Sequence, residues 1–205
     1  MNGITENPTR TLLKNVILTA LFIAISVVFG KMLEALPNIE LISFSVWMST
    51  YVLDRKYSTV VGFLSFLIHS MLSPYGVAPL PLLLSQAIGG ALIGFFGGSV
   101  IRSKKTKYSS SLPYDRCLAY LGFGLLITFV YDALTNFGGF AAFSENTSTL
   151  VAYMIGGLTF SVVHIVNNGI AFMLLTPLVK RAIDRVYFPT KSNLKRNEYV
   201  DSKSN

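Results

Sequence analysis

Polar and ionisable side chains occur inside the long apolar stretches of this sequence, where each of them is costly to bury. Asp132 and Asn136 are four residues apart, and so are His164 and Asn168. Residues at this spacing share one face of an α-helix, so each pair would project in the same direction. A carboxylate, an imidazole and two carboxamides offer donors and acceptors to a polar ligand, and an Asp with a His can also carry a proton.

Further polar residues lie near the ends of the same apolar stretches. Within a membrane, such residues either bond to neighbouring helices or mark binding sites and ion pathways. A single residue fits either interpretation, but a cluster favours a polar cavity. The candidate ligand-binding residues are Glu40, His69, Tyr75, Gln86, Tyr131, Asp132, Asn136, His164, Asn167 and Asn168.

Motifs of known catalytic and metal-binding chemistry are missing from the sequence. It contains neither H-E-x-x-H nor G-x-S-x-G, and it lacks the phosphate-binding G-x-x-x-x-G-K-[ST]. Cys117 is the single cysteine, which excludes an intramolecular disulfide and a cysteine-based metal site. His69 and His164 could pair with Asp132 in space, but no spacing requires it. We therefore expect a protein that is not an enzyme, with no metal and no cofactor.

The composition indicates an integral membrane protein. Of the 205 residues, 52% are hydrophobic and 13% are charged, and the mean hydropathy is +0.55. Soluble domains carry about 25% charged residues. The formal net charge of +7 arises in loops and in a basic C-terminal segment, where it would lie near anionic lipid. We expect no nucleic-acid binding, because no basic surface is interleaved with aromatic residues.

Six apolar segments separated by turns and charged loops predict an all-α integral membrane protein with six transmembrane helices. Pro37, the turn at residues 73–76 and the Gly138-Gly139 pair mark expected breaks. The second and third segments are the shortest, so they could be tilted or partly interfacial. Residues 1–188 would form the membrane domain, and residues 189–205 a polar, disordered cytoplasmic tail. The expected helices cover about residues 12–36, 38–53, 58–72, 79–101, 115–137 and 150–179.

Lys and Arg residues alternate with the apolar segments in a way that predicts the orientation. With the N-terminus inside, sixteen of the seventeen fall in cytoplasmic segments, as the positive-inside rule requires. Both termini would then be cytoplasmic, and most of the candidate ligand-binding residues would lie in the outer half. Lys31 is the exception: beside Glu34 it would form an interfacial ion pair or line the edge of the binding site.

Taken in their order along the chain, these features resemble the substrate-binding S components of energy-coupling factor (ECF) vitamin transporters. The resemblance covers about residues 10–185. It depends on the six-span layout and on the A-x-x-x-A pair of Ala20 and Ala24. It also includes the Pro-Asn-Ile-Glu-Leu stretch at 37–41 and the block from Ser-Pro-Tyr-Gly at 73–76 through Gln-Ala-Ile-Gly-Gly at 86–90 to the glycines at 97–98.

The resemblance implies a binding and transport subunit of a prokaryotic cytoplasmic membrane. Such proteins bind a vitamin or related micronutrient near the outer face. Their A-x-x-x-A face docks on a membrane coupling subunit driven by two ATPase subunits, so this chain itself would use no ATP. They are thought to topple in the membrane to release substrate inward. The 37–41 stretch is similar to members associated with cobalamin, whereas Asp132 and Glu40 equally suit a cationic or amine-bearing vitamin.

Two other functions fit parts of the pattern. A stand-alone secondary transporter could couple its substrate to protons through Asp132 or His164, although no inverted repeat is evident in the sequence. An intramembrane hydrolase or lipid-modifying enzyme could use the same two residues. Loss of uptake with an uncoupler would favour the former. Loss of catalysis on substitution of Asp132 or His164, with binding retained, would favour the latter.

Overall fold

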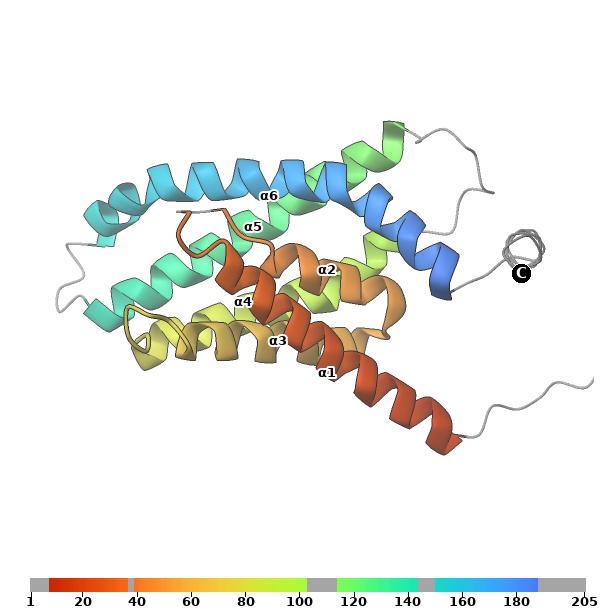
Figure 1. The fold of residues 1–205 in the computed structure, drawn as a ribbon. Helices are drawn as coiled ribbons and strands as arrows, with labels where there is room; N and C mark the ends of the chain where they lie inside the picture. Colours follow the sequence, from red (N-terminus) through yellow and green to blue (C-terminus); the bar gives the residue numbers. More distant parts are fainter. Residues whose placement is uncertain (1–7, 37–38, 103–113, 144–149, 188–205) are drawn as a thin grey trace, which may run out of the picture.

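The computed structural model describes residues 8–36, 39–102, 114–143 and 150–187, except for the side chains of residues 150, 153 and 154. Within these ranges the chain folds into six helices and contains no strand (Figure 1). The all-helical fold predicted from the sequence is therefore confirmed. The helices are α1 (Pro8–Met32), α2 (Ile42–Val52), α3 (Arg55–Met71), α4 (Leu80–Ile101), α5 (Tyr114–Phe143) and α6 (Leu150–Tyr187).

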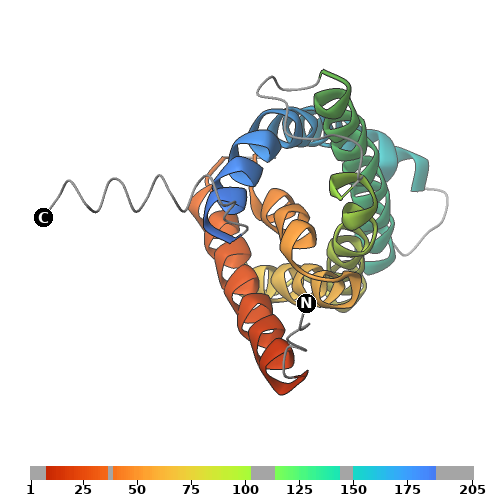
Figure 2. The same ribbon diagram turned by 90° about the vertical axis from the view of Figure 1, so that its right-hand side faces the viewer.

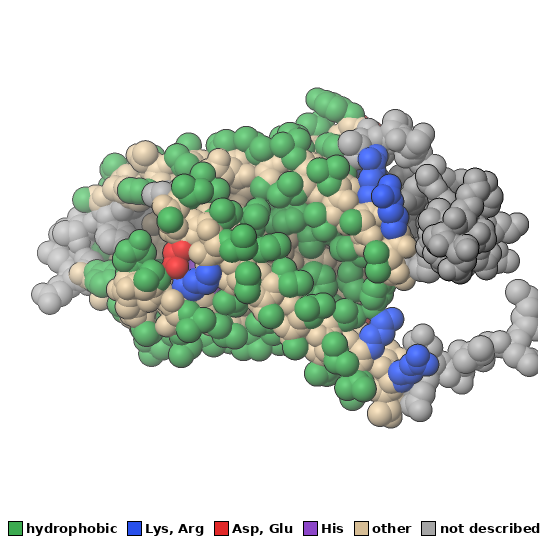
Figure 3. Space-filling view, viewed as in Figure 1, with side chains coloured by type: hydrophobic (Ala, Val, Ile, Leu, Met, Phe, Trp, Pro, Cys, Tyr) green, Lys and Arg blue, Asp and Glu red, His purple; other side chains and the backbone are tan. Residues whose placement is uncertain are grey.

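Four of these helices are long and apolar enough to cross a membrane: α1, α4, α5 and the Ile155–Tyr187 part of α6. Large apolar side chains also cover the outside of the molecule, for example Leu21, Phe129 and Leu174, each at least half exposed (Figure 3). Lipid is the solvent in which such a surface is stable, and helices satisfy their backbone hydrogen bonds internally there. The structure thus supports a multi-pass membrane protein.

The short helix α2 lies inside the bundle rather than at its edge (Figure 2). Its residues are buried from Ile42 to Thr50, and its 11 residues span about 17 Å, less than the roughly 30 Å of a hydrocarbon core. It carries no charge. Its buried hydroxyls donate to carbonyls of its own chain: Ser45 to Leu41 and Thr50 to Trp47, at 2.8 and 2.7 Å. The second predicted segment, 38–53, is thus a shorter core helix.

Aromatic rings around Trp47 hold α2 against α5 and α6. The ring centroid of Trp47 lies 4.4 Å from Phe123, 5.2 Å from Phe172 and 6.0 Å from Tyr120. Its indole N–H donates to the hydroxyl of Thr176 at 3.0 Å, so the one polar atom of this large buried ring is satisfied. This core fixes the position of α2 and, through it, of the connection that precedes it.

Glycines allow α4 to approach its neighbours closely, as the pattern of small residues predicts. A Cβ added at Gly94 would lie 2.0 Å from the carbonyl oxygen of Ser58, and one at Gly62 would lie 2.0 Å from that of Gly90. The backbones of α3 and α4 therefore touch at these positions. Gly97 similarly faces Thr50 on α2.

Several predicted helix boundaries differ from those of the structure. The Gly138-Gly139 pair is not a turn, because α5 continues through it to Phe143. Gly138 instead makes room for α4: a Cβ there would lie 2.2 Å from the hydroxyl of Ser85. The sixth helix likewise continues past residue 179, to Tyr187. The predicted tail, 189–205, lies outside the described residues.

Successive helices run in opposite directions, so the start of α1 and the end of α6 lie at the same end of the bundle (Figure 1). The Lys14 ammonium lies 4.7 Å from the centroid of the Tyr187 ring, which joins these two segments directly. Apart from Lys31, the Lys and Arg residues in the described ranges are found at helix termini of this same end (Figure 3), hereafter the basic end. They are Arg10, Lys14, Arg55, Lys56, Arg102, Arg116, Lys180, Arg181 and Arg185.

Candidate functional site

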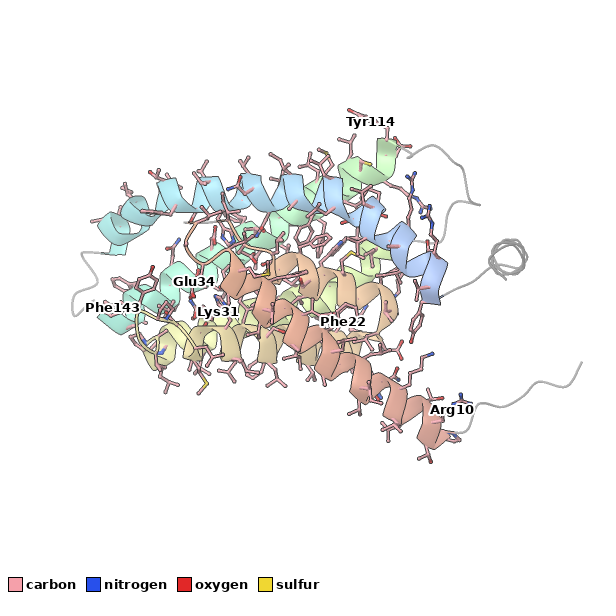
Figure 4. All side chains as sticks on the ribbon, viewed as in Figure 1. Arg10, Phe22, Lys31, Glu34, Tyr114 and Phe143 are labelled. Carbon is pink, nitrogen blue, oxygen red and sulfur yellow. The ribbon has the colours of Figure 1, made fainter. Side chains whose placement is uncertain are left out.

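A polar cavity of about 440 Å³ lies between the end of α1, the connection that follows it, and helices α3, α4, α5 and α6. Its position is toward the end of the bundle opposite the basic end, where Figure 4 labels Lys31 and Glu34. Seven of the ten candidate ligand-binding residues line it, although they come from distant parts of the chain. They are Glu40, His69, Gln86, Tyr131, Asp132, Asn136 and His164.

His164 connects two carboxylates at the centre of this cavity. Its Nδ1 lies 2.7 Å from Oδ1 of Asp132 on α5, and its Nε2 lies 3.4 Å from Oε1 of Glu40. The imidazole can donate to Asp132 in the neutral form, and to both carboxylates when it is protonated. The three side chains thus join α5, α6 and the connection before α2.

Asn168 contacts this group without lining the cavity. Its amide nitrogen lies 3.0 Å from Oε1 of Glu40 and 3.3 Å from the hydroxyl of Thr128, and Asn168 is almost completely buried. The same nitrogen lies 3.1 Å from Nε2 of His164. The sequence-based pairing of His164 with Asn168 on one helix face is therefore confirmed, and Asn168 has a positioning role.

Glu40 lies in the connection between α1 and α2, outside both helices. Its Oε2 accepts a hydrogen bond of 2.8 Å from the backbone N–H of Ser43, in the first turn of α2. Burial alone would raise the pKa of Glu40, but the hydrogen bonds with His164 and Ser43 outweigh burial and lower the pKa below its usual value. Glu40 is therefore a carboxylate at neutral pH.

Two buried polar atoms of the cavity-lining residues have no hydrogen-bond partner within the described ranges. They are Oδ2 of Asp132 and Nδ1 of His69. Asp132 is 8% exposed, and Oδ1, its other carboxylate oxygen, is already bonded to His164. Buried polar atoms are normally paired, so each of these two lacks a hydrogen bond that the protein would usually supply.

The side-chain amides of the site form hydrogen bonds with hydroxyl groups on neighbouring helices. Gln86 accepts a hydrogen bond of 2.6 Å from Ser70, which ties α4 to α3. Asn136 donates to Ser161 at 3.3 Å, which ties α5 to α6. A Cβ at Gly157 would lie 2.7 Å from Oδ1 of Asn136, so this glycine leaves space for the amide. Ser161, which sequence reasoning missed, lies one turn before His164.

Lys31 and Glu34 form an ion pair of 2.8 Å at the edge of the cavity (Figure 4). Each side chain is about a quarter exposed, at 25% and 23%. Glu34 lines the cavity, while Lys31 does not. The ion pair expected between Lys31 and Glu34 is therefore confirmed, and it is Glu34, not Lys31, that belongs to the cavity wall.

Three of the ten predicted residues do not line the cavity. Tyr75 is 86% exposed in the turn after α3, and Asn167 is not part of the cavity wall, although it lies only three residues from His164 on α6. Asn168 is the third, behind Glu40 and His164. The cavity wall also includes Thr135, and Phe160 and Gly30, which no polar pattern singled out in the sequence.

Comparison with known proteins assigns no family to the chain. No family model matches it, and no match is found among curated proteins or solved structures. The site itself provides acidic groups, hydrogen-bond donors and aromatic rings around one cavity. This arrangement is suited to binding a small polar molecule.

Proposed function

We propose that this chain binds a vitamin or related micronutrient as the substrate-specific S component of an ATP-driven ECF importer. The cavity carries this proposal, because five separate segments of the bundle contribute polar side chains to one volume. Pockets for small molecules are of about 300–1,000 Å³ and combine apolar walls with a few fixed polar groups. A volume of about 440 Å³ favours a vitamin of one or two rings over a corrinoid.

The location of the basic residues supports an outward-facing cavity. In this proposal the basic end is cytoplasmic, as the positive-inside rule requires, both termini are inside, and six passes place the cavity in the outer half. The connection at residues 39–41 together with the short α2, and then α3, would carry the chain across within the bundle, shielded from lipid over much of their surface by their neighbours. Lys31 would then be in the outer half, neutralised by Glu34.

This orientation predicts the accessibility of single cysteines introduced in a Cys117→Ser background. Tyr75→Cys, in the exposed turn after α3, is expected to react with a membrane-impermeant thiol reagent in intact cells. Lys56→Cys, at the start of α3 at the basic end, is expected to react only after permeabilisation. Labelling in the opposite order would contradict the proposed orientation.

The surface of α1 supports docking to a coupling subunit. Ala20 and Ala24 are both exposed, one helical turn apart, and the N-terminal half of α1 extends away from the other helices (Figures 1 and 2). Its neighbours Val16, Ile17 and Leu21 are also exposed. Small residues on a membrane helix allow another helix to approach closely. The partner in this proposal is the membrane subunit of the importer, with two ATPase subunits bound to it.

Introducing bulk on this face tests the proposed function. Ala20→Trp with Ala24→Trp is expected to abolish ATP-dependent uptake and co-purification with the coupling subunit, while ligand binding is unchanged. The matched control is Leu174→Trp with Leu178→Trp, which adds rings at the same spacing to exposed positions on α6. Uptake that survives the α1 change, or is lost equally in the control, would contradict the docking surface.

A proton-coupled secondary transporter remains the second candidate, because Asp132, His164 and Glu40 form a continuous chain of titratable groups. Such chains form proton paths in pumps and transporters. Uptake in cells without ECF ATPases, lost on addition of an uncoupler while ATP is maintained, would favour this candidate. Uptake that requires ATP and the coupling subunit would exclude it.

A further inference from the structure

We infer that the molecule bound in this cavity is a cation, or an amine-bearing heterocycle, whose N–H group donates to Oδ2 of Asp132. This inference rests on the proposed binding function and specifies the chemical class of the substrate. It is argued from the unpaired atom, the charge of the cavity wall, and the size and aromatic lining of the cavity.

Asp132 provides the acceptor. The residue is 8% exposed and lies in the cavity wall, and its Oδ2 has no partner within the described ranges. Oδ1 is occupied by His164 at 2.7 Å, which fixes the orientation of the carboxylate. A buried carboxylate oxygen without a donor is unfavourable, so a ligand that supplies an N–H gains a charge-assisted hydrogen bond.

The charge of the cavity wall selects for a cation. Glu34, Glu40 and Asp132 contribute three negative charges, and the ion pair with Lys31 offsets that of Glu34. If His164 is protonated the site retains one negative charge, and if it is neutral the site retains two. Either state attracts a positive ligand in a low-dielectric environment.

The same wall has no group that would bind an anion strongly. None of the residues that line the described cavity is Lys or Arg, and the nearby Lys31 is already paired with Glu34 at 2.8 Å. A ligand carboxylate or phosphate would therefore face carboxylates, and His164, the one wall residue that could carry a positive charge beside them, already has its two ring nitrogens against Asp132 and Glu40. Vitamins that are anions at neutral pH are disfavoured by this arrangement.

Aromatic residues next to Asp132 suit a flat ring that carries the positive charge. Tyr131 and Phe160 line the cavity, and the Tyr131 ring is fixed by edge contact with His164 at 5.9 Å and by Phe66 at 5.0 Å between centroids. Cations bind favourably against such rings. The volume of about 440 Å³ accommodates one or two rings.

Equilibrium binding to the purified full-length protein in detergent tests the inference. The probes are pyridoxamine and pyridoxine, which differ in an aminomethyl and a hydroxymethyl group, with thiamine as a second cation and biotin and pantothenate as anions. In parallel, mass spectrometry identifies any small molecule released from the protein. We expect the cationic probes to bind at least tenfold more tightly than the neutral and anionic ones, and any released molecule to bear an amine or a positive charge.

Two matched variants locate the effect. Asp132→Asn keeps the shape and the Oδ1 acceptor but removes the charge, and it is expected to weaken binding of a cation at least tenfold. Asp54→Asn removes a charge from an exposed side chain at the basic end and is expected to change binding less than twofold. Thermal unfolding, followed by the fluorescence of Trp47, establishes that both variants are folded.

The outcomes separate the inference from the function on which it rests. The inference would be overturned, with the binding function intact, if the bound or released molecule is an anion. The same holds if that molecule is neutral and has no amine group. Unchanged cation affinity in a folded Asp132→Asn variant would do the same. If no probe binds and no molecule is released, both the inference and the proposed binding function are contradicted.

Discussion

Replacing His164 with alanine is expected to destabilise the folded protein by about 3–5 kcal/mol, the usual effect of removing one partner of a buried ion pair. The imidazole bridges Asp132 and Glu40 with its two nitrogens, so its loss leaves two buried carboxylates without this partner. The connection that carries Glu40 would also lose its direct contact with α6 through this ring. Ligand binding should be lost as well.

Thermal unfolding in detergent measures this effect, because Trp47 is the only tryptophan of the chain and is fully buried. Adding Asp132→Asn to His164→Ala should recover part of the lost stability, since one of the two uncompensated charges is then removed. His164→Gln, which retains a single N–H donor, should be intermediate. A melting temperature for His164→Ala equal to that of the unchanged protein would show that the bridge contributes nothing to the fold.

The second large effect is expected from a single methyl group between α3 and α4. In Gly94→Ala the new Cβ would lie 2.0 Å from the carbonyl oxygen of Ser58, which belongs to the backbone and cannot rotate away. The two helices must separate, so we expect a loss of about 3 kcal/mol or more, at the upper end of the cost of overpacking.

Gly98→Ala, one turn further along α4, is the matched control. Its nearest neighbours would be 3.8 Å from the added Cβ, an ordinary contact. Alanine favours helix over glycine by about 1 kcal/mol, so this variant should be neutral or more stable. The two changes are chemically identical, and opposite shifts in melting temperature are expected. Equal shifts would mean that α3 and α4 do not meet at Gly94.

The sequence determined the helical class and the segregation of charge. Long apolar segments can satisfy their backbone in lipid only as helices, and Lys and Arg between these segments mark one side. These are local properties, read directly from residue types and spacing. The same holds for Lys31 and Glu34, whose i,i+3 spacing predicts the ion pair seen in the structure.

Helix termini were less predictable, because glycine has two opposite uses. Gly138 and Gly139 are typical of a turn, yet Gly138 lies within α5 where Ser85 of α4 requires the space. A sequence alone does not distinguish a glycine that ends a helix from one that admits a neighbour. The position of α2 at the centre of the bundle likewise depends on contacts of Trp47 with residues more than seventy positions away.

Candidate site residues could be recognised in the sequence by their type, because polar groups in apolar helices are rare. The role of each residue could not be recognised in the same way. The sequence brings His164 and Asn168 to one face of a helix, whereas only the tertiary structure places Glu40 against both, from more than 120 residues away. The tertiary structure also leaves Oδ2 of Asp132 unpaired within the described ranges, and it places Tyr75 outside the cavity. Periodicity specifies which face a side chain occupies, while helix rotation and packing decide which faces meet, and these arise from contacts between distant segments.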